Sequence, residues 1–190
     1  MNYNKHYHLA GKHAFLSASS YHWVNYTPEK LRGVYTSYRA KEEGTILHDF
    51  ASVAITRRLK MANHKKSLNM FVNDAIGYRM ESELTLYYSD NCFGTADAIL
   101  LEEREGMPDL LRIHDLKTGY SKVSTKQLEV YAALFCLEYG IVPESIEYEL
   151  RIYQHNDIQF GYPTPEQISV IMEKIVDFDK IIDEMKQEIG

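Results

Sequence analysis

The sequence predicts an α/β domain with a mixed sheet, and the order of its patterns is the reason. Helical patterns open the chain, and three consecutive strand patterns follow between residues 79 and 117. A helical pattern at 126–139 separates the third strand from a fourth at 145–154. Strands joined by short turns favour an antiparallel meander, whereas a strand reached through a crossover helix is added in parallel. We therefore expect a three-stranded meander extended by one strand through a helix.

The first helices are predicted from caps and apolar spacing. Thr27-Pro28-Glu29 is typical of a helix start, and we expect this helix to end near Ala40. Gly44-Thr45 then introduces a second helix, whose apolar residues at 46, 47, 50, 51, 54 and 55 share one face. His48 lies at the edge of that face. A third, short helix is predicted at 67–78, after a basic segment.

The strands and the later helices have clear boundaries. Residues 79–89 and 92–102 are expected to pair across a tight turn, and residues 110–117 form the third strand. Ser124 or Thr125 can cap the helix at 126–139, which Gly140 ends. A short extended piece follows the fourth strand, and a last helix runs from Thr164-Pro165-Glu166 to near residue 188.

Length and hydropathy define the class of protein. At 190 residues we expect one domain, with an N-terminal helical arm (1–43), a catalytic core (44–160) and a C-terminal helix (161–190). No apolar run is long enough to cross a bilayer, so no membrane partner is expected. The first residues lack the apolar stretch of a signal peptide, which predicts a cytoplasmic protein.

Charge and cysteine count exclude other classes. The net charge of −6 argues against a passive nucleic-acid coat, although an enzyme that grips DNA through local patches remains compatible. The best candidate patch for phosphate contacts is the basic stretch Arg57, Arg58, Lys60, Lys65 and Lys66, with a solvated helix end as the alternative. Only Cys92 and Cys136 occur, which excludes a cluster held by four cysteines.

Acidic residues stand on the second and third predicted strands, and Asp115 lies near the end of the third. Asp115 and Lys117 alternate onto the same face, and Asp97 is expected on one face with Thr95 and Ile99. If the strands are neighbours, Asp97 and Asp115 converge, and a divalent cation relieves their repulsion. Oxygen ligands suit Mg²⁺ or Mn²⁺. The backbone carbonyl of Leu116 adds another oxygen, and Lys117 would stand beside the metal.

These motifs carry a resemblance to a known family. "GTILH", "GTADAILLE", "HDLKTG" and "QLEVYA" follow one another in the chain. In this order they resemble the RecB-like branch of the PD-(D/E)XK nuclease superfamily, which includes phage and bacterial recombination exonucleases. The resemblance covers roughly residues 44–153. It implies a restriction-endonuclease-like core with the order α-βββ-α-β.

The resemblance implies roles for individual residues. It makes His48, Asp97, Asp115 and the Leu116 carbonyl ligands of one or two Mg²⁺ or Mn²⁺ ions. Lys117 would position the attacking water, and the residues of a Gln-x-x-x-Tyr motif would brace the site or touch DNA; these are Gln127 and Tyr131. Several relatives hold an iron–sulfur cluster, which two cysteines exclude here.

The expected function is metal-dependent hydrolysis of DNA to 5′-phosphates, with an exonuclease favoured over an endonuclease. DNA is the expected partner, and a single-strand annealing protein is a candidate second partner. The location would be the cytoplasm of a bacterium, or of the host cell if a phage encodes the protein. The alternative is a non-catalytic DNA- or partner-binding module on the same fold.

Each motif also has a plainer interpretation. Asp115 and Lys117 alone could be a strand-end ion pair, and His48 a packed core histidine. Gln127 could be a surface residue and Tyr131 a core ring. Glu81 and Glu83 could supply a further acid to the site, but a solvated strand face is favoured for them.

Overall fold

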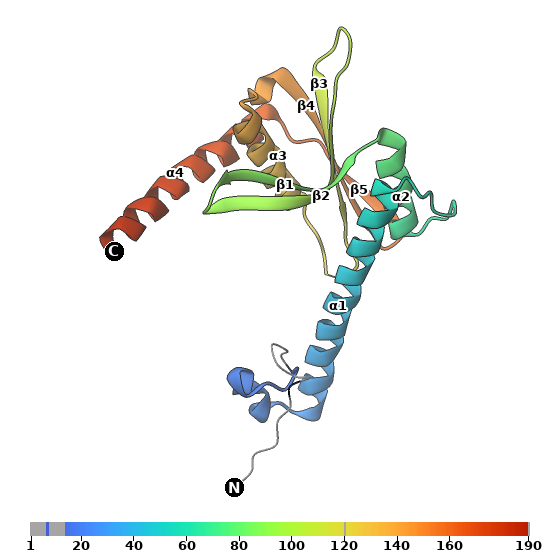
Figure 1. Ribbon diagram of the computed structural model, residues 1–190, viewed down its shortest axis with the longest axis vertical. Helices are drawn as coiled ribbons and strands as arrows, with labels where there is room; N and C mark the ends of the chain where they lie inside the picture. Colours follow the sequence, from blue (N-terminus) through green and yellow to red (C-terminus); the bar gives the residue numbers. More distant parts are fainter. Residues whose placement is uncertain (1–6, 8–13, 120, 190) are drawn as a thin grey trace. The chain divides into compact units, whose positions relative to one another are not determined.

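Helices flank one five-stranded sheet (Figure 1). The computed structural model describes residue 7 and residues 14–119 and 121–189. The chain divides into two units, Met1–Glu43 and Gly44–Gly190. The first unit holds the 3₁₀ segment η2 (Ala18–Asn25), and in it the ring of Phe15 packs against Tyr35 and Tyr38 with centroids 5.0 and 5.2 Å away. The sheet and its helices belong to the second unit.

Helix α1 (Pro28–Thr56) is continuous, so the predicted break between residues 40 and 44 is wrong. The cap is as expected, because the Lys30 amide donates to Thr27 Oγ1 at 3.2 Å. Gly44 is buried inside the helix, and a Cβ there would lie 2.7 Å from Thr118 Oγ1. The glycine therefore serves a close approach to the loop after the third strand rather than a helix end.

Helix α2 (Ser67–Tyr78) has the predicted bounds and ends at Arg79, whose φ of 61° is left-handed. Strands β1 (Glu81–Ser89), β2 (Cys92–Glu102) and β3 (Asp109–Leu116) follow as the predicted antiparallel meander.

Helix α3 (Lys126–Tyr139) connects β3 to β4 (Ile146–Gln154), which pairs with β3 in parallel as expected. Gly140 ends α3 with a φ of 64°. The short extended piece is β5 (Asp157–Gly161), which pairs antiparallel with β4 and completes the order β1-β2-β3-β4-β5. Helix α4 (Pro165–Ile189) is the predicted last helix.

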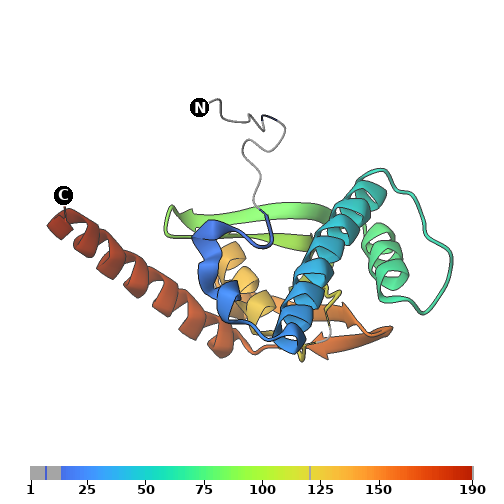
Figure 2. The same cartoon turned by 90° about the horizontal axis from the view of Figure 1, so that it is seen from below.

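Apolar clusters lie on both faces of the sheet, and Figure 2 shows the helices beside its strands. An α3-side cluster joins the sheet to α3 and to the start of α4, and includes Leu86, Ala96, Ile99, Ile113, Leu128 and Ile168. An α2-side cluster joins the other face to α2 and to the end of α1, and includes Ile55, Phe71, Val72, Ala98, Leu116 and Tyr153. The sheet is thus covered on both sides, as an α/β arrangement requires.

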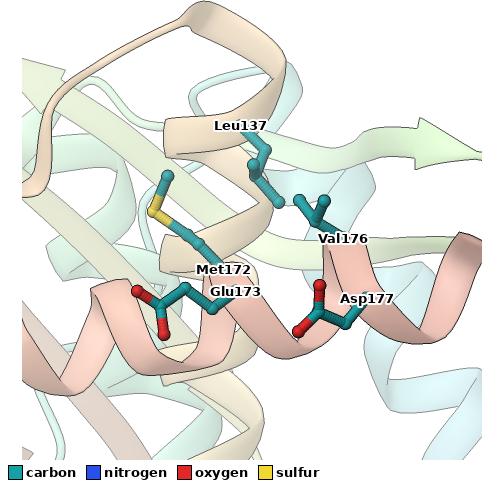
Figure 3. Close-up of a pocket in the computed structure, with 5 residues that line it drawn as sticks. All are labelled: Leu137, Met172, Glu173, Val176 and Asp177. Carbon is teal, nitrogen blue, oxygen red and sulfur yellow. The ribbon is translucent and has the colours of Figure 1, made fainter.

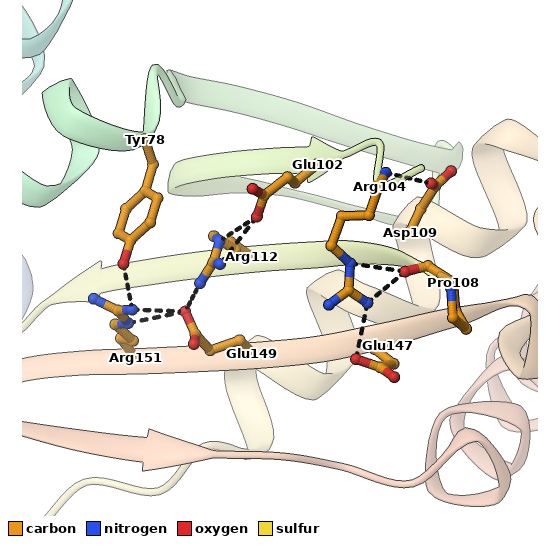
Figure 4. Close-up of polar contacts among 9 residues, drawn as sticks. All are labelled: Tyr78, Glu102, Arg104, Pro108, Asp109, Arg112, Glu147, Glu149 and Arg151. Atoms are coloured by element: carbon orange, nitrogen blue, oxygen red, sulfur yellow. Dashed lines mark hydrogen bonds and ion pairs between the residues drawn. The ribbon is translucent and has the colours of Figure 1, made fainter. Parts of the chain in front are cut away.

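Arginines connect the central strands on the α2 side (Figure 4). Arg112 on β3 forms ion pairs with Glu102 on β2 and Glu149 on β4. Arg151 also pairs with Glu149, and its Nη2 donates to the Tyr78 hydroxyl at 2.9 Å. Because these cations have carboxylate and hydroxyl partners, the partly buried guanidinium groups are stabilised. The contacts fix β2, β3 and β4 against α2.

Among the residues that the structure describes, no helix is both long and apolar enough to cross a membrane.

Candidate metal centre

His48 on α1 and Asp97 in the middle of β2 lie close together. His48 Nδ1 lies 3.2 Å from Asp97 Oδ2, although the two residues are far apart in sequence. The same carboxylate oxygen accepts a hydrogen bond from the Leu116 amide at 2.9 Å, which ties β2 to the end of β3. Helix α1 and two strands therefore converge at one point. His48 and Asp97, which the resemblance names as ligands, lie together there, and their role as ligands stays a prediction.

Glu83 joins this pair. His48, Glu83 and Asp97 each offer a ligand atom, and these atoms lie within 4.8 Å of one another. The register places Ser82 opposite Ala98 and Leu84 opposite Ala96, so Glu83 falls directly across from Asp97. The sequence favoured a solvated strand face for Glu83, and its side chain is exposed, but it also lies beside Asp97. The hairpin register was the signal that could have identified it, because cross-strand neighbours interact.

The alternation of side chains between the two faces of the sheet changes at Glu83 and Asp97. Leu84, Leu86 and Ala96 pack on the α3 side, whereas Met80 and Ala98 pack on the α2 side. In both strands, the even-numbered side chains therefore lie on one face of the sheet before Glu83 or Asp97 and on the other face after it. Glu83 has a φ of 55°, which is rare for a non-glycine residue within a strand.

The expectation that Thr95, Asp97 and Ile99 share one face is consequently wrong. Ile99 belongs to the α3-side cluster, whereas Thr95 Oγ1 lies on an exposed surface, 3.0 Å from Thr85 Oγ1. The physical reason is the irregular backbone opposite Asp97, which interrupts the two-residue period of a regular strand.

Asp115 is the buried acid of the site, with 2% of its surface exposed. Lys117 Nζ lies 3.0 Å from each of its carboxylate oxygens and donates a hydrogen bond to Oδ1. Oδ2 is buried and has no hydrogen-bond partner among the described residues. Burial, and then the charge of Asp97, raise the pKa of Asp115 to about 6.

Gln127 and Tyr131 continue the site onto α3. Lys117 Nζ donates to Gln127 Oε1 at 2.9 Å, and Gln127 Nε2 donates to the Tyr131 hydroxyl at 2.9 Å. The two side chains share one helix face, as their spacing predicted. A Cβ at Gly94 would lie 2.9 Å from Tyr131 Cε1, so the absence of a side chain on β2 makes room for this ring.

A second polar chain lies behind Asp115, on the α2 side. His114 is fully buried, and its Nδ1 lies 3.2 Å from the Tyr153 hydroxyl, which donates to Asp74 Oδ2 at 2.7 Å. Burial, with Arg151 and Arg112 nearby, holds the pKa of His114 well below its usual value. The imidazole is therefore neutral near pH 7. The Lys117 amide donates to the Tyr153 carbonyl at 2.9 Å, so this chain also supports the end of β3.

The pKa shifts of the other candidate ligands have related causes. The hydrogen bond with Asp97 raises the pKa of His48. Burial, followed by the charge of Asp97, raises the pKa of Glu83. The pKa values of Glu83 and Asp115 are thus both raised by burial and by the charge of Asp97, as expected for carboxylates held together without a compensating cation.

The donor set fits a divalent cation. His48, Glu83 and Asp97 supply one imidazole and two carboxylates. The neighbouring Asp115 carries a buried oxygen that accepts no hydrogen bond from the described residues. A hard cation such as Mg²⁺ or Mn²⁺ accepts these ligands and would offset their mutual repulsion. The Leu116 N–H, not its carbonyl, contacts Asp97 here, so carbonyl ligation stays a prediction.

No family model, curated protein or solved structure matches this chain. The proposal of a function therefore rests on the geometry of the site.

The predicted basic stretch lies in the connection between α1 and α2. Its five cationic residues are all exposed: Arg57, Arg58, Lys60, Lys65 and Lys66. The stretch begins directly after α1 ends at Thr56, and His48 lies earlier in the same helix. Their exposure leaves them accessible to a polyanion.

Proposed function

We propose that this chain is a Mg²⁺- or Mn²⁺-dependent deoxyribonuclease, of exonuclease type, with a restriction-endonuclease-like core. The observation that carries the proposal is the convergence of His48, Glu83 and Asp97 with the Asp115–Lys117 pair. A surface ion pair would not need a buried acid, one of whose carboxylate oxygens accepts no hydrogen bond from the part of the chain that the structure describes. The α-βββ-α-β order of the second unit is compatible with the proposed core.

The ligands would be His48, Glu83, Asp97 and Asp115, with the Leu116 carbonyl as a further oxygen. A cation bound there would supply charge neutralisation and a water acidic enough to serve as a nucleophile near neutral pH. Glu83 extends the ligand set that the sequence predicted. Its place opposite Asp97 makes it the natural additional carboxylate.

Lys117 would act on the reacting groups. Its ammonium group would hold the attacking water and offset charge on the phosphate as the transition state forms. Attack of the water oxygen on phosphorus, with departure of the 3′-oxygen, leaves a 5′-phosphate and a 3′-hydroxyl. The hydrogen-bonded Gln127 would keep the Lys117 side chain in place, and Tyr131 would keep Gln127 in place.

The basic connection after α1 would contact the DNA backbone. Phosphate contacts from exposed lysines and arginines are not sequence specific, and they weaken as salt rises. An exonuclease needs such contacts because it must act on any sequence.

The test is cleavage of end-labelled linear, circular and single-stranded DNA with Mg²⁺ or Mn²⁺. Linear DNA should be degraded from its ends and circular DNA spared. Asp97→Asn should reduce cleavage by at least about a hundredfold. Glu83→Gln should weaken metal binding, whereas the matched variant Glu81→Gln, two residues away on β1, should match the unaltered protein.

Two results would overturn the proposal. One is tight DNA binding with no cleavage of any DNA form in either metal, which would make the chain a binding module. The other is a correctly folded Asp97→Asn variant that cleaves at the original rate.

A further inference from the structure

The distal half of α4 exposes an apolar stripe. Phe178, Ile181 and Met185 are 60%, 50% and 54% exposed, and Ile182 beside them is 38% exposed. Their spacing of three and four residues places them on one side of the helix. A helix in water does not gain stability from such a stripe unless something covers it.

Earlier residues on this same side of α4 are already in contact with the rest of the unit. Ile168, Ile171 and Ile175 pack into the α3-side cluster. Figure 3 shows Met172 and Val176 beside Leu137 of α3, where they line a groove of about 500 Å³. The stripe therefore continues the packed side of α4 beyond the core, where Phe178 and Ile182 line a pocket with Asn91 and Cys92 and remain exposed.

The turn between β1 and β2 holds another side of the helix. Asp179 accepts hydrogen bonds from Ser89 and Asn91 at 2.5 and 2.8 Å. Asn91 also donates to Asp183 at 2.9 Å. These contacts fix the rotation of α4 about its own axis, and Phe178, Ile181 and Met185 stay exposed.

Charges at the two ends of the stripe are opposite. Lys174 lies seven residues before Ile181 and Glu188 seven residues after it, and both are exposed. On a helix, seven residues are nearly two turns, so both charges lie on the side of Ile181. The stripe thus has a cation at one end, an anion at the other and Ile181 midway.

We propose that α4 pairs antiparallel with α4 of a second copy of this chain, about a twofold axis at Ile181. Ile181 then contacts the partner copy's Ile181, and Phe178 faces the partner copy's Met185. Each Lys174 meets the partner copy's Glu188, which gives two equivalent ion pairs. Parallel pairing would instead place Lys174 against Lys174 and Glu188 against Glu188, so the charges select the antiparallel arrangement.

Two acidic residues are expected to lower the affinity of the pairing. Asp177 and Glu184 lie near the edge of the stripe and would approach each other across the same axis. Exposed like charges oppose association weakly, because water and salt screen them. A concentration-dependent dimer is therefore expected. The inference does not depend on the proposed nuclease activity, since α4 contributes none of the proposed ligands.

A thiol cross-linking experiment tests the geometry. In a Cys92→Ser background, Ile181→Cys should form a covalent dimer with a short bifunctional thiol reagent. Phe178→Cys alone should not, because the two copies of that position lie roughly 9 Å apart along the helix axis. A mixture of Phe178→Cys and Met185→Cys chains should cross-link. Equal cross-linking of each variant alone would indicate a parallel pair, and no cross-linking would refute the pairing.

Charge reversal tests the energetics, with sedimentation equilibrium as the measurement. Lys174→Glu should weaken the dimer about tenfold, or about 1.4 kcal/mol, because two attractive pairs become repulsive. Adding Glu188→Lys in the same chain should restore the dimer. Lys180→Glu is the matched control on another side of α4 and should have little effect. A chain that stays monomeric at every concentration, or a dimer that Ile181→Glu leaves intact, overturns the proposal.

Discussion

Replacing Asp115 by asparagine should stabilise the metal-free protein while it abolishes cleavage. Asparagine has the same shape without the charge, and its Oδ1 can still accept from Lys117. The carboxyl group of Asp115 is buried and its pKa is about 6, against an ordinary value of 3.8. Each unit of pKa corresponds to about 1.36 kcal/mol, so the ionised form costs about 3 kcal/mol in the folded chain.

The sign of the pH dependence follows from the raised pKa. Above pH 6 the folded Asp115 is charged and its burial costs the full amount. As pH falls from 6 towards 4, the folded state takes up a proton before the unfolded state does, so stability is gained. The advantage of Asp115→Asn should therefore be largest above pH 6 and should vanish below about pH 4.

Urea unfolding with a chelator present, from pH 4 to pH 8, measures this difference. Asp157→Asn is the matched control, since Asp157 is exposed on β5. Mg²⁺ should stabilise the unaltered protein more than Asp115→Asn, because the variant lacks a ligand charge. If Asp115→Asn is less stable than the unaltered protein at pH 8 without metal, the assigned cost of the buried charge is wrong.

Three further predictions concern the neighbouring residues. Lys117→Ala should retain Mn²⁺ binding by calorimetry and lose at least about a hundredfold in cleavage rate, because it removes the group that positions water and not a ligand; equal losses of both would make Lys117 structural. His48 gains a partner in Asp97, so the stability it contributes should be present below about pH 6.5 and lost as pH rises through its raised pKa. His48→Gln should remove that slope from metal-free unfolding curves, and an unchanged slope would contradict the contact. Gly44→Ala should weaken Mn²⁺ binding by displacing α1 from Thr118, and Thr118→Ala in the same chain should restore it; undiminished binding in the single variant would show that Thr118 moves aside instead.

Local patterns predicted the elements whose boundaries depend on neighbouring residues. Helix α3 starts after Thr125 and ends where Gly140 adopts a left-handed conformation, both as expected. Helix α2 also has the predicted bounds, because its apolar residues and the polar segments on either side of it follow one another directly in the sequence. The pairing of Gln127 with Tyr131 follows from helical spacing alone.

Features that depend on distant contacts could not be predicted in this way. Gly44 suggested a helix break, yet it lies inside α1 because the loop at Thr118 approaches there. The alternation along β2 could not reveal the change of faces at Asp97, since its cause is the backbone of Glu83 on the neighbouring strand. For the same reason the sequence could not decide between Glu83 as a further acid of the site and Glu83 on a solvated strand face.

The small space beside Gly94 has a consequence for how this chain tolerates mutation. Any other residue at this position must push the ring of Tyr131 away, because even a methyl group would lie 2.9 Å from it. A library randomised at position 94 and sorted only for expression should recover alanine and serine, since the ring can turn towards solvent. The same library sorted for a working site should retain glycine alone. Positions that differ between the two selections would map the residues whose conformations the site requires.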